Sequence, residues 1–366
     1  DFSATPPPPL LEDEPPLVEP PLVRPRKPGP GILMSIAWWF VLLAAQLVIG
    51  IAAAVVLAVI AIVRLGPQFK EAFQANGPKL LFDQPGAFPI LFLSATGGTL
   101  LVGAALVLLM HRSHARRRIA LRGFSPLQAL LVILLVPPVL LVGSEISTLA
   151  SRVLRPLHLN DPAYEKLATE SWPMVLFLGC ILPAAGEELF FRGFLSRGLV
   201  ARHGVILGTI FTSLLFGLMH VDPPQVVGTA ILAVAMQYVY LNMKSLLAPI
   251  LLHALNNSLA FGLMKLANDP QTRAKLGAED NAHVPLLLVG AAVAAVVGLA
   301  WLIYQTRTRW VLPDGRVWSP GYVTAEMPSP YLDAVPRPTA PRAEAVAAAL
   351  LGYAWLVGAL VWELRK

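Results

Sequence analysis

The chain has 366 residues, of which 56% are hydrophobic and 14% charged, and its mean hydropathy is +0.64. Soluble domains carry about a quarter charged residues, so this composition excludes an ordinary soluble domain and indicates an integral membrane protein. The net charge of +6 then reflects loop asymmetry across a bilayer and predicts no nucleic-acid partner. Cys180 is the single cysteine, which excludes an intrachain disulfide.

The N-terminal segment, residues 1–31, is rich in proline and carries scattered acidic residues. Such a composition cannot bury a hydrophobic core. We therefore predict a disordered or polyproline-like tail, which ends in the basic residues Arg24, Arg26 and Lys27.

Apolar runs of roughly the length needed to cross a bilayer follow this tail. Eight of them cover residues 32–64, 87–110, 126–150, 173–198, 204–221, 225–243, 246–267 and 284–305, and a shorter ninth covers 344–362. The predicted fold class is all-α: a polytopic membrane bundle of eight core helices with a ninth helix at the C-terminus.

The distribution of Lys and Arg predicts the orientation. With the N-terminus inside, the inner segments carry about twice as many Lys and Arg residues as the outer ones, which agrees with the positive-inside rule. The densest cluster, Arg112–Arg122, is predicted to anchor the topology by contacting lipid headgroups. The sequence thus predicts a multi-pass protein with a cytoplasmic N-terminus.

Residues 310–312 and 316–318 flank Pro313-Asp314-Gly315 and predict a small cytoplasmic hairpin. With this hairpin, composition divides the chain into five parts. The parts are the tail 1–31, the first membrane helices with a basic loop 32–125, a membrane core 126–305, the hairpin with a Pro-rich linker 306–343, and an extra membrane helix 344–366.

Two adjacent carboxylates, Glu187 and Glu188, lie within the fourth apolar run. Insertion scales assign roughly 2.5–3.5 kcal/mol to one charged residue at a bilayer centre, so partners or chemistry must compensate. Arg192 follows Glu188 by four residues and is predicted to pair with it on one helix face. Glu187 is rotated by about 100° from Glu188 and must face something else.

Three further polar residues lie deep in apolar runs: His220 in the fifth, and His253 and Asn257, four residues apart, in the seventh. Counted from the predicted helix ends at about 1.5 Å per residue, these side chains and Glu187 can meet in the middle or inner half of the bilayer. Intramembrane ionisable residues are few and usually functional. We therefore predict that they surround one site.

Such a site permits two kinds of chemistry. A carboxylate and an imidazole can deprotonate a water, while a second histidine and a carboxamide can donate hydrogen bonds to an oxyanion. Alternatively, Glu187, His220 and His253 could bind a divalent metal that leaves one position open for water. The residues alone do not separate these alternatives, and histidine and asparagine also serve as plain interhelical hydrogen-bond partners.

In this order, Glu187-Glu188-x-x-x-Arg192, Phe216-x-x-x-His220 and His253-x-x-x-Asn257 resemble the three motifs of the CAAX protease and bacteriocin-processing (CPBP, or ABI) family of intramembrane endopeptidases. The type II CAAX prenyl endopeptidase is its eukaryotic relative. The resemblance covers about residues 126–305. It implies an eight-helix α-bundle whose cavity opens to the cytosolic side and to the lipid.

The resemblance also implies a role for each residue. Glu187 is expected to activate water with His220 assisting, and His253 with Asn257 to stabilise the oxyanion. Glu188 and Arg192 are expected to support this site. The expected reaction needs no cofactor, with a zinc-dependent protease as the competing description.

The expected substrate is a membrane-associated or lipidated peptide or protein. Prenylated C-terminal peptides, bacteriocin leaders and membrane regulators all remain open. A different class of function is a non-catalytic membrane scaffold or sensor that binds a protein partner through the N- or C-terminal tail. A transporter is disfavoured because the sequence shows neither repeat symmetry nor broken helices.

Overall fold

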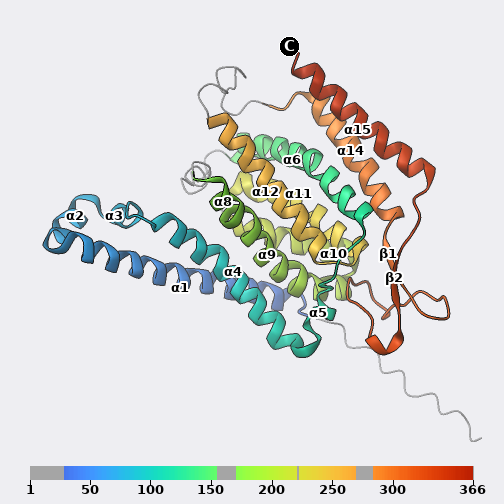
Figure 1. Cartoon of the computed structure of the whole chain (residues 1–366), viewed down its shortest axis with the longest axis horizontal. Helices are drawn as coiled ribbons and strands as arrows, with labels where there is room; N and C mark the ends of the chain where they lie inside the picture. Colours follow the sequence, from blue (N-terminus) through green and yellow to red (C-terminus); the bar gives the residue numbers. More distant parts are fainter. Residues whose placement is uncertain (1–28, 155–169, 221, 269–282, 366) are drawn as a thin grey trace, which may run out of the picture.

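The computed structural model describes residues 29–154, 170–220, 222–268 and 283–365. Most of the predicted tail, including Arg24, Arg26 and Lys27, lies outside the described residues. Figure 1 shows a bundle of long helices with one small two-stranded sheet. Eight helical stretches in the described residues are long and apolar enough to cross a membrane, and this confirms the predicted polytopic helical bundle.

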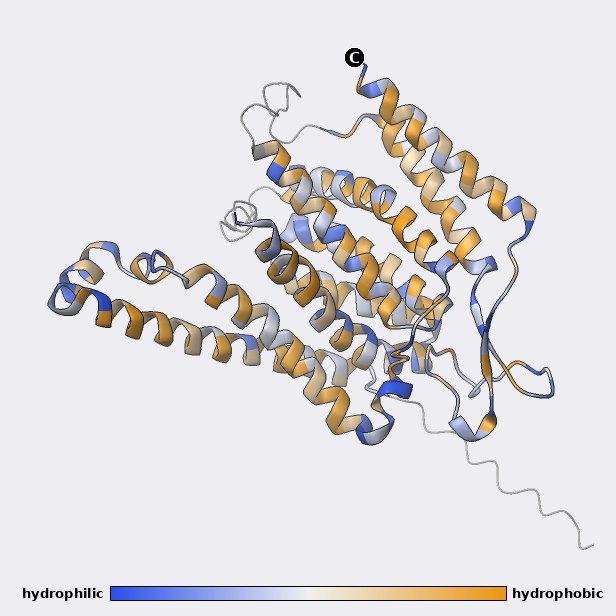
Figure 2. Ribbon diagram, in the orientation of Figure 1, coloured by the Kyte–Doolittle hydropathy of each residue, from blue (hydrophilic) through white to orange (hydrophobic). Residues whose placement is uncertain are grey.

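These stretches account for the nine predicted runs, because the fourth and fifth runs are joined in one stretch. Figure 2 shows that apolar residues dominate along them. Their bounds are α1 Ile32–Leu65, α4 Ala87–His111, α6 Pro126–Leu154, the joined stretch Trp172–His220, α11 Pro223–Met243, α12 Leu247–Asn268, α14 Leu286–Gln305 and α15 Ala343–Glu363.

The joined stretch bends at Gly204. Gly204 has φ 80° and ψ 175°, a conformation that favours glycine because a side chain would be strained there. Beyond the bend, a Cβ on Gly208 would lie 2.6 Å from the Cα of Val200, so the backbones on the two sides of the bend pack against each other. The chain therefore reverses direction here, as the gap between the fourth and fifth runs predicts.

Before the bend, the stretch alternates between helix types. It contains α8 Trp172–Met174, the π-helix η4 Val175–Ile181, α9 Leu182–Glu188, the π-helix η5 Leu189–Leu195, α10 Ser196–Gly217 and the 3₁₀ turn η6 Leu218–His220. Short π-helical segments are rare and often mark functional sites. The Glu187-Glu188 pair ends the α-helical turn between the two π-helices.

The first two long helices form an arm. Figure 1 shows α1 and α4 extending side by side away from the other helices, and the Gln46 amide donates to the Thr99 hydroxyl across them at 2.8 Å. Two short helices, α2 Phe69–Asn76 and α3 Lys79–Phe82, connect their far ends. The main hydrophobic core gathers side chains of α6, η5, α10 and α11, and Leu42, Leu106 and Val107 join it from the arm.

The basic loop, the bend at Gly204, the end of α11 and the C-terminal segment lie together at one end of the bundle. The helix α5, Ala115–Arg118, belongs to this end, and it is strongly hydrophilic in Figure 2. Here Arg122 donates to the Met243 and Lys244 carbonyls at 2.8 and 2.9 Å. Segments that the sequence assigns to the inner side therefore share one end, which we call the basic end.

The small sheet contains the predicted hairpin and one further strand. Strand β1, Thr308–Val311, pairs antiparallel with β2, Val335–Pro338. On the other edge of β1, the predicted second arm forms an antiparallel bridge between Val311 and Val317. The Leu312 N–H donates to the Arg316 carbonyl and the Trp318 N–H to the Trp310 carbonyl, each at 2.8 Å, so the predicted hairpin around Pro313-Asp314-Gly315 is present, and β2 is the strand that the sequence did not predict.

Candidate functional site

The Glu188 carboxylate is the centre of the buried charge in the bundle. Its side chain is fully buried, and its Oε1 accepts hydrogen bonds from Arg192 Nη1 at 2.7 Å and from His253 Nδ1 at 3.2 Å. Arg192 Nη2 also donates to the Ala233 carbonyl at 2.8 Å. The predicted Glu188–Arg192 pair is therefore confirmed, and it joins the fourth run to both α11 and α12.

His253 is 3% exposed. An ionised carboxylate only accepts hydrogen bonds, so the Nδ1 of His253 must carry the proton in its contact with Glu188. This contact orients the ring and occupies one of its two nitrogens with a hydrogen bond to Glu188. Sequence reasoning placed both residues in one site but did not identify this bond, because it joins positions 65 residues apart.

Phe216 brings the two histidines together. Its buried ring has its centroid 5.4 Å from that of His220 and 5.7 Å from that of His253, and the Arg192 guanidinium carbon lies 4.9 Å from it. A guanidinium over an aromatic face is attracted to the ring electrons. Phe216 thus acts as the common wall of the site.

Glu187 is half-buried and lies within electrostatic range of His220 and Arg192. Its Oε2 is shielded from solvent and has no hydrogen-bond partner among the described residues. Leaving a buried acceptor unpaired costs about 1–3 kcal/mol. This oxygen therefore marks a position where a water or a substrate group can bind beside His220.

Asn257 differs from the predicted arrangement. It follows His253 by one turn of α12, but its Nδ2 donates to the Gly179 carbonyl of η4 at 3.1 Å. This bond is of the interhelical kind that often fixes membrane helices. The structure therefore brings His220 and His253 together around Phe216, with Glu187 in electrostatic contact with His220, while Asn257 is hydrogen-bonded to a neighbouring helix.

Within the described parts of the chain, no group of three or more His, Cys, Asp or Glu side chains is arranged to hold a metal ion. The three ligands of the zinc alternative, Glu187, His220 and His253, thus lack a preformed ligand geometry. We derive no catalytic step through a metal.

A second buried charge cluster lies at the basic end, and sequence reasoning missed it. Glu326, from the segment predicted to be a Pro-rich linker, is 3% exposed. Its Oε2 accepts from Arg197 at 2.7 Å and from Arg118 at 3.3 Å, and its Oε1 accepts from the Tyr322 hydroxyl at 3.2 Å. No spacing rule links Glu326 to Arg197 or Arg118, which lie 129 and 208 residues away in the sequence.

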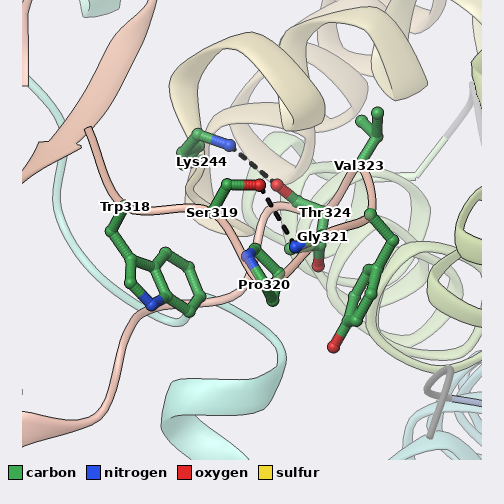
Figure 3. Close-up of a pocket in the computed structure, with 8 residues that line it drawn as sticks. Lys244, Trp318, Ser319, Pro320, Gly321, Val323 and Thr324 are labelled. Carbon is green, nitrogen blue, oxygen red and sulfur yellow. Dashed lines mark hydrogen bonds between the residues drawn. The ribbon is translucent and has the colours of Figure 1, made fainter. Parts of the chain in front are cut away.

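A cavity of about 470 Å³ opens beside this cluster. It is lined by Lys244 and by residues 318–324, and Figure 3 shows the Lys244 amine directed at the Thr324 carbonyl, to which it donates at 2.7 Å. Burial, with a smaller contribution from Arg122, lowers the pKa of Lys244 to about 8. Neither Glu187 nor the two histidines line this cavity.

These features define a polytopic helical membrane protein whose interior holds a cluster of carboxylate, guanidinium and imidazole groups. Residues 169–259 match the family model for Type II CAAX prenyl endopeptidase Rce1-like proteins, consistent with the CAAX protease (CPBP) family. The match includes Glu187, His220, His253 and Asn257, and it supports a CAAX-type intramembrane protease at the family level. Comparisons with curated proteins and with solved structures found no match.

Proposed function

We propose that the protein is an intramembrane endopeptidase that hydrolyses a peptide bond in a membrane-associated or lipidated peptide. The observation that carries this proposal is the unpartnered, shielded oxygen of Glu187 within electrostatic range of His220. A general base needs a carboxylate or imidazole that can reach a water. Glu188 also has one unpaired oxygen, but its other oxygen already accepts from Arg192 and His253, so we assign this task to Glu187.

In the proposed reaction, Glu187 with His220 takes a proton from a water whose oxygen bonds to the scissile carbonyl carbon. The carbonyl oxygen becomes an oxyanion. When the carbon–nitrogen bond breaks, the proton passes to the leaving amine, and the products are a carboxylic acid and an amine. Loss of such a general base typically lowers the rate by about 10²–10⁴-fold.

His253 is proposed to stabilise the oxyanion. Because its Nδ1–H is held by Glu188, Nε2 can donate a hydrogen bond only when the ring is an imidazolium. Asn257 can join His253 if substrate replaces the Gly179 carbonyl as its hydrogen-bond partner. Glu188 and Arg192 then act as positioning residues for His253.

The proposal includes the surroundings of the site. The protein would lie in a lipid bilayer with its N-terminus and the basic end in the cytoplasm, because Lys and Arg residues gather there. The substrate would be a peptide or protein with a membrane anchor. No metal cofactor is required, since the steps above use only side chains of this chain.

The test is cleavage of a prenylated peptide that ends in a CAAX sequence by the purified protein in lipid nanodiscs. Glu187→Gln and His220→Ala should abolish turnover, whereas Gln46→Leu, a change in the α1–α4 arm, should leave it intact. Mass spectrometry of the products gives the cleavage position. Full activity in either site variant would refute the proposed roles.

Metal dependence is tested in the same assay. We expect cleavage to persist after treatment with a chelator. Loss of cleavage on chelation, with recovery on adding zinc, would instead support the zinc-dependent alternative.

A further inference from the structure

A column of buried polar side chains leads from the candidate site toward the basic end. Each member is at most 3% exposed, although apolar helices surround the column. The members are Glu188, Arg192, Ser213, Gln237, Tyr240, Arg197 and Glu326.

The part of the column nearest the candidate site is linked through α11. Arg192 donates to the Ala233 carbonyl, and Gln237 lies one turn further along the same face of α11. Ser213 precedes Phe216 by three residues on α10, so it lies one turn from the ring that the Arg192 guanidinium covers. These side chains therefore line the contact between α10 and α11.

Tyr240 connects this part to the basic end. It lies one turn beyond Gln237 on α11, is 1% exposed, and donates from its hydroxyl to the Ile119 carbonyl at 3.2 Å. It interacts electrostatically with Glu188 as well as with Arg197 and Glu326. Tyr240 thus lies between the site cluster and the second charge cluster.

Many polar atoms along this column have no partner. In the described parts of the chain, no hydrogen bond reaches the Oε2 of Glu188, the Nε of Arg192, the Oγ of Ser213, the Nε of Arg197, or either amide atom of Gln237. Gln237 is the clearest case, because it is fully buried and lacks partners for both donor and acceptor. Buried polar groups in folded proteins are almost always paired.

The unpartnered groups of the column include both donors and acceptors. Water is the small molecule that serves both, and buried waters typically bridge about three such groups. A hydrolytic site enclosed by apolar helices also needs a route for water. The column supplies one that begins at Glu188, next to the proposed base.

We propose that a file of ordered waters occupies this column and delivers water from the basic end to Glu187. The presence of the waters follows from the unpartnered polar atoms alone. Their role in supplying the reaction rests on the proposed function. Gln237 is then a positioning residue that holds the file between α10 and α11.

Radiolytic hydroxyl-radical footprinting of the full chain in nanodiscs tests the water file, because radicals form where water is bound. Tyr240 and Phe216 should be oxidised despite burial, well above Phe194, which is also 1% exposed but packs against Trp38. Gln237→Leu should reduce Tyr240 oxidation to the level of Phe194, and Ser213→Ala should reduce that of Phe216. The matched control Gln46→Leu should change neither. Equal oxidation of Tyr240 and Phe194 in the unmodified protein, or unchanged oxidation in both column variants, would overturn the proposal.

The cleavage assay tests the delivery role. Gln237→Leu should lower kcat about tenfold and leave KM unchanged, because water supply is impaired and peptide binding is not. An unchanged kcat combined with lost Tyr240 oxidation would overturn the delivery role. If Glu187→Gln still cleaved while Tyr240 remained oxidised, the proposed function would fail and the water file would stand.

Discussion

Among the described residues, Glu188 and Glu326 are the two carboxylates buried against arginine side chains, and they differ in how completely they are paired. Glu188 in the candidate site uses only Oε1, which accepts from both Arg192 and His253, while its Oε2 has no partner among the described residues. Glu326 at the basic end uses both oxygens, with partners Arg197, Arg118 and Tyr322.

This difference separates a structural cluster from a reactive one. A buried carboxylate with both oxygens paired fixes the elements that it joins, as Glu326 does for the C-terminal segment. The site, in contrast, retains unpaired oxygens on both Glu188 and Glu187. Unsatisfied polar atoms persist where a ligand, a water or a reaction uses them.

Glu188→Ala should destabilise the protein most. It leaves the fully buried Arg192 guanidinium without its counter-charge, and breaking a buried pair in this way costs about 3–5 kcal/mol. Equilibrium unfolding in mixed detergent measures the loss. A loss no greater than that in Glu326→Ala would contradict the assignment of Glu188 as the central buried charge.

Glu326→Ala should cost less, about 1.5–3 kcal/mol. One of its partners, Arg118, has a side chain that is 37% exposed and can be hydrated after the carboxylate is removed. Cleavage should persist, because this cluster does not touch the proposed reacting groups. The control is Asp314→Ala, which removes an exposed pair with Arg316 and should leave the free energy of unfolding unchanged. If Glu326→Ala and Asp314→Ala had equal effects, Glu326 would not hold the C-terminal segment.

Lys244 gives the stability of the basic end a pH dependence. Its folded-state pKa of about 8 lies below the ordinary value of 10.5, so the unfolded chain binds more protons between these pH values. The free energy of unfolding should therefore rise as pH increases from about 8, by on the order of 1 kcal/mol per pH unit. Unfolding across this range measures it.

Lys244→Met is the variant that isolates this contribution. It should flatten the rise in unfolding free energy between pH 8 and 10, because the group that titrates is gone. A rise of the same size in Lys244→Met would assign the pH dependence to other groups.

Glu187→Gln should change the stability least. Unlike Glu188→Ala, it should not lower the free energy of unfolding. It removes a charge whose Oε2 is unpaired, so the variant should be as stable as the unmodified protein or more stable by up to about 1 kcal/mol. Substitutions at these two adjacent residues would then change the free energy of unfolding in different ways. Clear destabilisation by Glu187→Gln would show that this carboxylate has a structural partner.

The sequence predicted what depends on local spacing. The Glu188–Arg192 pair lies four residues apart on one helix, and the reversal at Gly204 falls between two apolar runs. The bond between Glu188 and His253 could only be expected as a meeting of polar residues, because nothing in the sequence sets the rotation of one helix against another. Asn257 illustrates this, since it donates to Gly179 and not to the predicted site.

Longer-range features were missed for physical reasons. Glu326 binds cations that are 129 and 208 residues away, and such pairs leave no periodic signal in the sequence. The π-helices η4 and η5 on either side of the Glu pair have no distinctive residue pattern either. Ser213 and Gln237, in contrast, are polar residues within apolar runs. Because Gln237 lies deep in the sixth run, its polarity could have identified it as a candidate functional residue.

In the proposed mechanism, Glu187 activates water while Glu188 supports the fold. Its most direct test is the cleavage rate of Glu187→Gln on a prenylated CAAX peptide, measured on protein whose unfolding has been compared with that of the unmodified chain. We predict a loss of at least about 10²-fold in rate with no loss of stability. Cleavage at the unmodified rate by the stably folded variant would contradict the account.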